Sequence, residues 1–200
     1  MPVRTRLAAL AAVCLLAGTG SAVAAERGGT ASLSAVSVQA ELFSNGSFET
    51  PTVREGAALY LPAGQTIGPW LVASGSVDHI GPGYWQAADG VQSLDLNGLG
   101  PGAVSQTFAT IPQQRYTLTY ALAGNPNGLP TVKTGRVVIN GETVQDFIFD
   151  ATGKTRANMG WETRTVNFTA TSSSTTLTFE STTIGPNGPA IDNVKICGCS

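Results

Sequence analysis

WLVASGSVDHIGPGYWQAADGVQSLDLN, residues Trp70 to Asn97, joins aromatic residues, turn glycines and an alternating strand in one stretch of the chain. This stretch contains no recognisable arrangement of catalytic groups, so it is more typical of a binding surface. NGSFE at Asn45–Glu49 precedes it, and GPAIDNVKI at Gly188–Ile196 follows near the end of the chain. Together the three stretches predict an extracellular β-sandwich closed by its two ends.

Short runs of alternating apolar and polar residues recur along the rest of the chain. In the clearest run, Tyr116, Leu118, Tyr120 and Leu122 occupy every second position, as a strand buried on one side requires. Turn residues separate the runs, and no long segment carries a helical apolar stripe. We expect an all-β fold, a two-sheet antiparallel jelly-roll sandwich. The expected strands are Val91–Leu96, Val104–Phe108, Tyr116–Leu122, Arg136–Asn140, Val144–Phe149, Arg164–Ala170, Thr175–Glu180 and Ile191–Ile196.

Residues 1–25 have the layout of a secretory signal peptide. Arg4 and Arg6 precede an apolar run, and small residues lead up to Glu26. The apolar run is shorter than the roughly 20 residues that a membrane-spanning helix needs. We therefore expect a secreted protein that is extracellular or associated with a cell wall, with no membrane contact after cleavage.

The mature chain is expected to form one domain. Residues 26–41 are small and polar and are interpreted as a flexible lead-in, and residues 42–196 as the sandwich, which is long enough to bury a real core. Residues 197–200 form a Cys-x-Cys tail. In an oxidising compartment Cys197 and Cys199 can pair with each other, link two chains as a dimer, or stay free.

Charge argues against nucleic acid as a partner. Removing residues 1–25 leaves nine basic and thirteen acidic residues, a formal net charge of −4. The basic residues are scattered among the acids and form no stripe of the kind that nucleic-acid binders show.

The chain contains few residues of the types that commonly catalyse hydrolysis. His79 is the only histidine, and no Gly-x-Ser-x-Gly sequence is present. A glycoside hydrolase needs two carboxylates about 5–10 Å apart, which Asp78, Asp89 and Asp95 provide in principle. We expect a protein that is not an enzyme and keep glycoside hydrolase as a minor alternative.

Motifs that carry a resemblance are spread over nearly the whole predicted domain: NGSFE, Pro69-Trp70, Gly75–Asp78, Tyr84-Trp85, Ala88–Gly90, Ser93–Leu96, Pro101-Gly102, Ser105–Phe108, Leu122–Asn125, Trp161-Glu162 and GPAIDNV. They resemble those of the choice-of-anchor C group and of the related plant cell-wall proteins of domain-of-unknown-function family 642. This resemblance implies a galactose-binding-like jelly roll, similar to many carbohydrate-binding modules and associated with walls or surfaces. In the plant relatives, binding of polysaccharide and of wall enzymes has been proposed.

The resemblance also suggests a structural calcium ion. In similar jelly rolls an acidic residue of the last strand and groups after the first strand hold calcium, and Asp192 and Glu49 are the matching positions. Calcium prefers such oxygen ligands. In the alternative interpretation, Glu49 caps a turn and Asp192 accepts backbone hydrogen bonds.

Sugar binding is assigned to the segment from Asp78 to Asp95. Sugars present apolar faces and a rim of hydroxyl groups, so their sites combine a flat ring with polar groups. Tyr84 and Trp85 are the candidate rings, although Trp85 also suits a core position. The polar candidates are Asp78, His79, Gln86, Asp89 and Asp95.

On the strand from Val91, the polar side with Ser93, Asp95 and Asn97 suits either a groove or a solvated face. We therefore expect a non-catalytic module that binds polysaccharide or another glycan. The alternative is an extracellular module that binds a cell-wall protein or has a structural role in a matrix.

Overall fold

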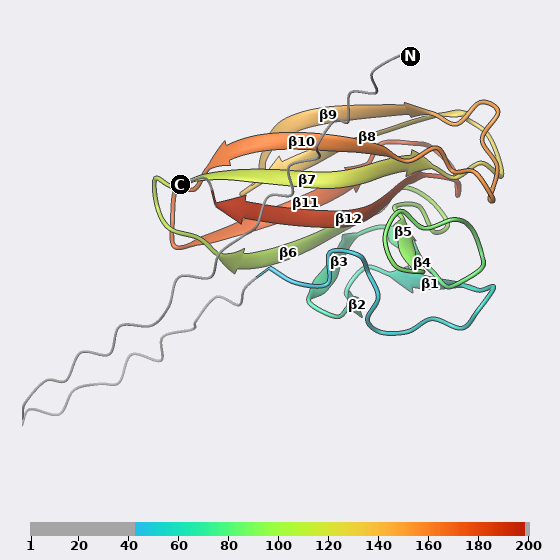
Figure 1. The fold of residues 1–200 in the computed structure, drawn as a ribbon, viewed down its shortest axis with the longest axis horizontal. Coiled ribbons are helices and arrows are strands. Elements are labelled where there is room, and N and C mark those ends of the chain that lie inside the picture. Colours follow the sequence, from blue (N-terminus) through green and yellow to red (C-terminus); the bar gives the residue numbers. More distant parts are fainter. Residues whose placement is uncertain (1–42, 199–200) are drawn as a thin grey trace, which may run out of the picture. The chain divides into compact units, whose positions relative to one another are not determined.

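The computed structural model describes residues 43–198, and every regular element in that range is a β-strand (Figure 1). The same residues contain no helix that is long and apolar enough to cross a membrane. The predicted signal peptide and the whole lead-in, residues 26–41, lie outside the described residues. The strands are β1 (Ala58–Pro62), β2 (Thr66–Ile67), β3 (Trp70–Ser74), β4 (Ser76–Ile80), β5 (Ser93–Asp95), β6 (Ala103–Ala109), β7 (Arg115–Gly124), β8 (Val132–Ile139), β9 (Glu142–Asp150), β10 (Glu162–Thr169), β11 (Ser174–Ser181) and β12 (Pro189–Gly198).

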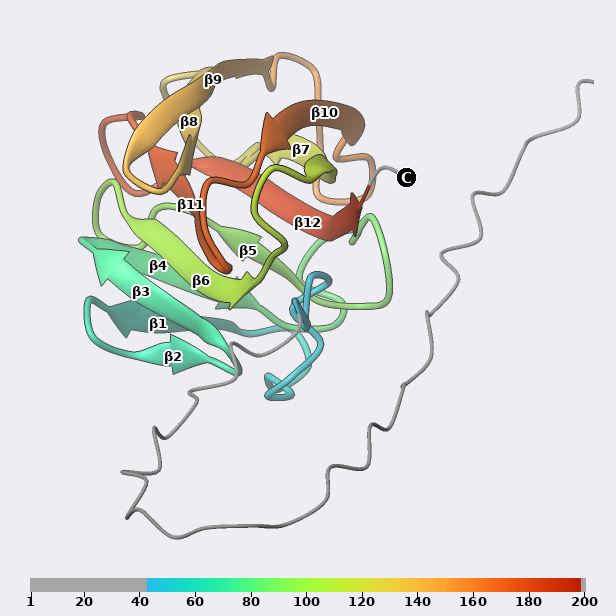
Figure 2. The same cartoon turned by 90° about the vertical axis from the view of Figure 1, so that its left-hand side faces the viewer.

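The strands form two six-stranded antiparallel sheets that pack face to face (Figure 2). The first sheet has the order β1-β4-β5-β12-β7-β10, and the second has the order β2-β3-β6-β11-β8-β9. Sequence neighbours are therefore often in different sheets, as in a jelly roll. The predicted two-sheet sandwich is confirmed.

Alternation along the strands builds the core between the sheets. In β7 the residues Tyr116, Leu118, Tyr120 and Leu122 are all buried. Tyr120 meets Phe179 of the opposite sheet edge to face, with ring centroids 4.9 Å apart. Burial of such large rings is a major source of stability in a sandwich.

The NGSFE segment connects the start of the described chain to its last strand. The Val194 N–H donates to the Gly46 carbonyl at 2.9 Å, and a side chain at Gly46 would collide with the Val194 carbonyl oxygen. Phe43 packs edge to face on Trp70 and Phe108 at 5.7 and 5.5 Å between ring centroids. Close backbone approach thus explains why a glycine follows Asn45.

Strands β1 to β4 were not among the runs expected from alternation. They are short, and Gly64, Gly68 and Gly75 adopt positive φ angles in the turns between them. Their pattern is also broken, because β4 is buried or half-buried at every position. A strand that is buried on one face and half-buried or buried on the other does not alternate clearly, so its period cannot be recognised in the sequence.

Candidate functional site

The outer face of the first sheet, on β1, β4 and β5, carries several of the residues predicted to bind a ligand. Asp78 pairs directly with Asp95 on β5, and Tyr60 on β1 pairs with Asp78 on its other side. Cross-strand partners share a face of a sheet. The neighbours of Asp78 along β4, Val77 and His79, are fully buried on the opposite face, toward the core.

His79 is a core residue and not a surface ligand, which corrects the prediction for this side chain. It is 0% exposed. Its Nε2 lies 2.7 Å from the Phe48 carbonyl oxygen and 3.3 Å from Nε2 of Gln92. Burial lowers the pKa of the imidazole, against the smaller opposing effects of the Phe48 carbonyl and of Glu49. Its role is to link the NGSFE turn to the sheet.

Trp85 is also buried, so the alternative core interpretation describes it better. The ring is 5% exposed, and its Nε1–H donates to the Ser93 hydroxyl at 2.7 Å. Ser93 lies two residues from Asp95 on β5 and therefore on the same face. The polar side of β5 is neither a solvated face nor an open groove, because the loop that carries Trp85 covers part of it.

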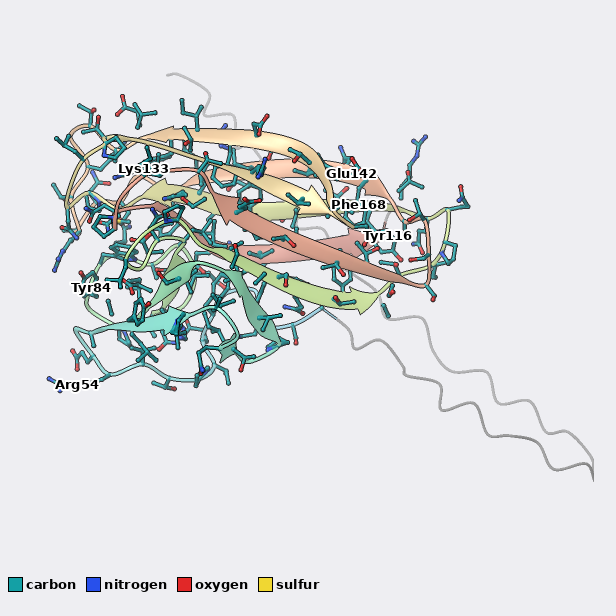
Figure 3. The ribbon with its side chains drawn as sticks, turned by 180° about the vertical axis from the view of Figure 1, so that it is seen from behind. Arg54, Tyr84, Tyr116, Lys133, Glu142 and Phe168 are labelled. Atoms are coloured by element: carbon teal, nitrogen blue, oxygen red, sulfur yellow. The ribbon has the colours of Figure 1, made fainter. Side chains whose placement is uncertain are left out.

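Tyr84 is not a free platform for a sugar ring. The Arg156 guanidinium carbon lies 4.2 Å from the centroid of its ring, and Nη2 donates to the Tyr84 hydroxyl at 3.3 Å. Trp85 meets the ring edge to face, with centroids 5.5 Å apart. Figure 3 shows Tyr84 toward the same end of the sandwich as Lys133, with Tyr116 and Phe168 toward the other.

Gln86 joins the loop between β4 and β5 to the loop between β9 and β10. Its backbone N–H donates to the Arg156 carbonyl at 2.7 Å, and its side-chain oxygen accepts from the Met159 N–H at 3.2 Å. Its own carbonyl accepts from the Trp161 indole N–H at 2.8 Å. These hydrogen bonds hold the two loops together, so the polar groups of Gln86 that form them are used within the protein.

Two carboxylates hold the loop that precedes β5. The Asp192 side chain, 0% exposed, accepts from the N–H groups of Ala88, Asp89 and Asn193 at 2.8, 3.0 and 2.6 Å. Glu49 accepts from the N–H groups of Val91 and Gln92, both at 2.8 Å. Desolvation by burial raises the pKa of Asp192 to about 7, against the lowering effect of the backbone hydrogen bonds. Asp89 itself is exposed and accepts from the Ser47 hydroxyl at 2.6 Å.

This arrangement matches the hydrogen-bonding alternative for Glu49 and Asp192. Each carboxylate is aimed at N–H donors, which repel a cation. Within residues 43–198, no group of three or more His, Cys, Asp or Glu side chains is placed to hold a metal ion. The two residues therefore fit a shared calcium ion poorly, and calcium stays a prediction for experiment.

Asp95 is a buried structural carboxylate. It is 1% exposed and accepts from the N–H groups of Asn97 and Gly188 at 2.9 and 3.1 Å and from the Asn125 amide at 2.7 Å. Desolvation by burial, with a smaller contribution from the charge of Asp78, raises its pKa to about 7, although these hydrogen bonds favour the ionised form. Asp95 is therefore occupied by protein donors.

Asp78 differs from Asp95 although the two are direct partners. It is half-buried, and burial raises the pKa of its carboxyl, with no hydrogen bond to a described residue opposing the effect. Tyr60, its partner on β1, is 45% exposed. An acceptor without a protein donor beside an exposed ring is the combination expected at a sugar site.

Sequence reasoning missed Tyr60. It lies in the apolar run Leu59-Tyr60-Leu61, which suggests a buried strand and gives no hint that one ring faces out. The position of β1 at the edge of the first sheet would have indicated an exposed ring. The order of the strands in a sheet cannot be read from the sequence.

A second exposed region lies on the loops after β7 and before β12. Leu129, Val132 and Ile184 are 79%, 40% and 83% exposed, and they line an apolar hollow of about 690 Å³. Next to Val132 in the chain, the side chain of Lys133 is buried. Its ammonium donates to the carbonyls of Gly128 and Asn187 at 3.0 and 2.8 Å. Lys133 therefore fixes the two loops to each other.

Comparison with known proteins supplies a family. The model of the family described as "Protein of unknown function (DUF642)" matches residues 41–197, which confirms the resemblance to family 642 noted from the motifs. Halomucin of Haloquadratum walsbyi is 36% identical over 176 residues, which cover 84% of this chain and 2% of halomucin. The chain thus spans a very small part of that relative.

Solved structures with a similar fold include carbohydrate-binding modules. TmCBM61, in complex with β-1,4-galactotriose, has a TM-score of 0.53 at 14% identity, over 80% of this chain and 99% of that one. The CBM35 from Cellvibrio japonicus Abf62 has a TM-score of 0.46 at 23% identity, over 72% and 95% of the two chains. At such identities the likeness concerns the fold.

Proposed function

The chain belongs to the DUF642 family, and from this premise and its surface we propose that it is a secreted, non-catalytic module that binds extracellular polysaccharide. The observation that carries the proposal is the pair of Tyr60 and Asp78. The exposed ring offers an apolar face to a sugar, and the adjacent carboxylate offers hydrogen-bond acceptors that no described protein donor occupies.

The sandwich fold supports this proposal without identifying the sugar. TmCBM61 binds β-1,4-galactotriose on a similar fold. Unrelated functions share this kind of fold, so the site residues have to carry the argument. We therefore place the sugar on the Tyr60 side of the first sheet.

A non-catalytic role is supported by the state of the acidic residues. A hydrolase acting through Asp78 and Asp95 needs both carboxyl groups to reach the substrate. Asp95 is 1% exposed and accepts three protein hydrogen bonds. It is thus placed to support the sheet and not to flank a glycosidic bond.

The test of this function is retention on polysaccharide by matched variants. Leu59 and Tyr60 are neighbours on β1 with the same 45% exposure, but alternation points them to opposite faces. We expect Tyr60→Ala to lose most retention on the polysaccharide that the mature protein binds, and Leu59→Ala to keep it. Equal retention by both variants would remove the site.

Export and assembly are further parts of the proposal. Cleavage after Ala25 is checked by the mass of the protein recovered outside the cell. Cys197 and the neighbouring Cys199, which lies outside the described residues, are proposed to link two chains, and mobility on a non-reducing gel distinguishes the dimer from the monomer.

A second candidate function is favoured by the apolar hollow of Leu129, Val132 and Ile184. It offers aliphatic side chains and no aromatic ring, which suits an apolar protein partner better than a sugar. A cell-wall protein bound there would make the chain an extracellular interaction module. Ile184→Asp would weaken such binding and leave polysaccharide retention unchanged.

A further inference from the structure

We propose that the surface of Tyr60 and Asp78 selects amino sugars, whose amine carries a positive charge, over neutral sugars and most strongly over uronic acids. The inference rests on the proposed function and names the ligand class for the same site. It starts from the strand register, which places Tyr60, Asp78 and Asp95 side by side on one face.

The first step concerns the two carboxyl groups. Side chains directly opposite on antiparallel strands have Cβ atoms about 4.5–5.5 Å apart, and like charges in such pairs repel. Asp95 cannot move away, because Asn97, Asn125 and Gly188 all donate to it. Asp78 therefore lies next to a fixed acid and has no hydrogen-bond donor among residues 43–198.

The second step concerns the cations nearby. Lys133 interacts electrostatically with Asp95, but its ammonium is committed to the carbonyls of Gly128 and Asn187. Arg156 is committed to Tyr84 and Asn127, to whose side-chain oxygen it donates at 3.0 Å. Neither cation hydrogen-bonds the carboxylate of Asp78.

A ligand ammonium would supply the hydrogen-bond donors and the positive charge that no described residue brings to Asp78. Three N–H donors on one charged group can meet the open oxygens of Asp78, while the sugar ring lies on Tyr60. A sugar carboxylate at the same place would be repelled by the carboxylate of Asp78. A neutral sugar can donate hydroxyl groups but gains no charge attraction.

The experiment compares oligosaccharides of positive, neutral and negative charge. Binding of glucosamine and galactosamine oligomers to the mature protein is measured beside their N-acetylated forms and beside oligogalacturonate, at low and at high salt. We expect about tenfold tighter binding of the free amines, no measurable binding of oligogalacturonate, and a preference that shrinks as salt screens the charges.

Matched variants assign the preference to one residue. Asp78→Asn and Asp89→Asn each remove one acidic side chain. Asp89 lies on the covering loop, residues Gly81 to Gln92, where its exposed carboxylate accepts from Ser47. Asp78→Asn should bring the amine and the N-acetylated oligomers to equal affinity, and Asp89→Asn should leave the preference intact.

The outcomes separate the inference from the function. If neutral or acidic oligomers bind at least as well as the amines, the selectivity is wrong and polysaccharide binding stands. If the preference survives Asp78→Asn, another site causes it. If no oligomer or polysaccharide binds, the proposed function itself fails.

Discussion

The loop from Gly81 to Gln92 and the pair of Tyr60 and Asp78 lie on the same face of the first sheet. They differ in whether their polar groups form hydrogen bonds within the protein. In the loop, Trp85 and Gln86 hydrogen-bond to other parts of the protein, and Asp192 of β12 accepts from the loop backbone. At the pair, the Asp78 carboxylate has no such partner among the described residues. Polar residues whose hydrogen bonds are all made within the protein support the surface, whereas a polar residue without a protein partner is available to a ligand.

The largest expected difference between the two regions is in stability. Trp85→Ala removes a ring that is 5% exposed and should cost about 3–5 kcal/mol of unfolding free energy. Tyr60→Ala removes a ring that is 45% exposed and should cost roughly 1 kcal/mol or less. Chemical denaturation measures both, and similar losses would contradict the assignment of one ring to the core and the other to the surface.

Asp192→Ala tests whether a carboxylate fixes the covering loop. Three backbone N–H groups would lose their acceptor, and a buried unsatisfied donor costs about 1–3 kcal/mol. We expect a loss of about 2–3 kcal/mol and faster amide exchange at Ala88 and Asp89. Asp89→Ala is the control, since within the described part of the chain its exposed side chain accepts only from Ser47. Unchanged amide exchange in Asp192→Ala would show that other contacts hold the loop.

The core of the sandwich could be predicted because alternation in Tyr116–Leu122 directly reports one buried side. The covering loop could not, because a sequence does not say which polar residues meet each other across the fold. His79 and Trp85 suit a sugar site by residue type, but the structure places one against the Phe48 carbonyl and the other against Ser93. Tyr60 was missed for the converse reason, since an apolar run does not show which ring faces out.

The pH dependence of stability tests the buried carboxyls. Asp95 and Asp192 have pKa values near 7 in the folded protein, raised from an ordinary value of 3.8. A carboxyl with a raised pKa binds protons more tightly when folded, so stability should rise as pH falls from about 7 toward about 5. The gain should be at least ~1.4 kcal/mol, the value of one pKa unit.

Denaturation at several pH values measures this gain, and Asp95→Asn serves as the control because it should flatten part of the profile. Stability that falls over the same range would show that the hydrogen bonds to these carboxylates outweigh desolvation.

The smallest expected effect is that of calcium. Because Glu49 and Asp192 accept backbone N–H groups, we expect the thermal midpoint to change little between calcium and chelator. A rise of several degrees with calcium would restore the ion at the chain ends, and Glu49→Gln should then abolish that rise.

The most direct test of the account is retention of residues 26–200 and of the Tyr60→Ala and Leu59→Ala variants on a panel of soluble and insoluble polysaccharides. The account predicts selective retention of the unchanged protein and of Leu59→Ala, and loss with Tyr60→Ala. Retention of Tyr60→Ala on the same polysaccharide, or of no protein on any polysaccharide, would contradict it.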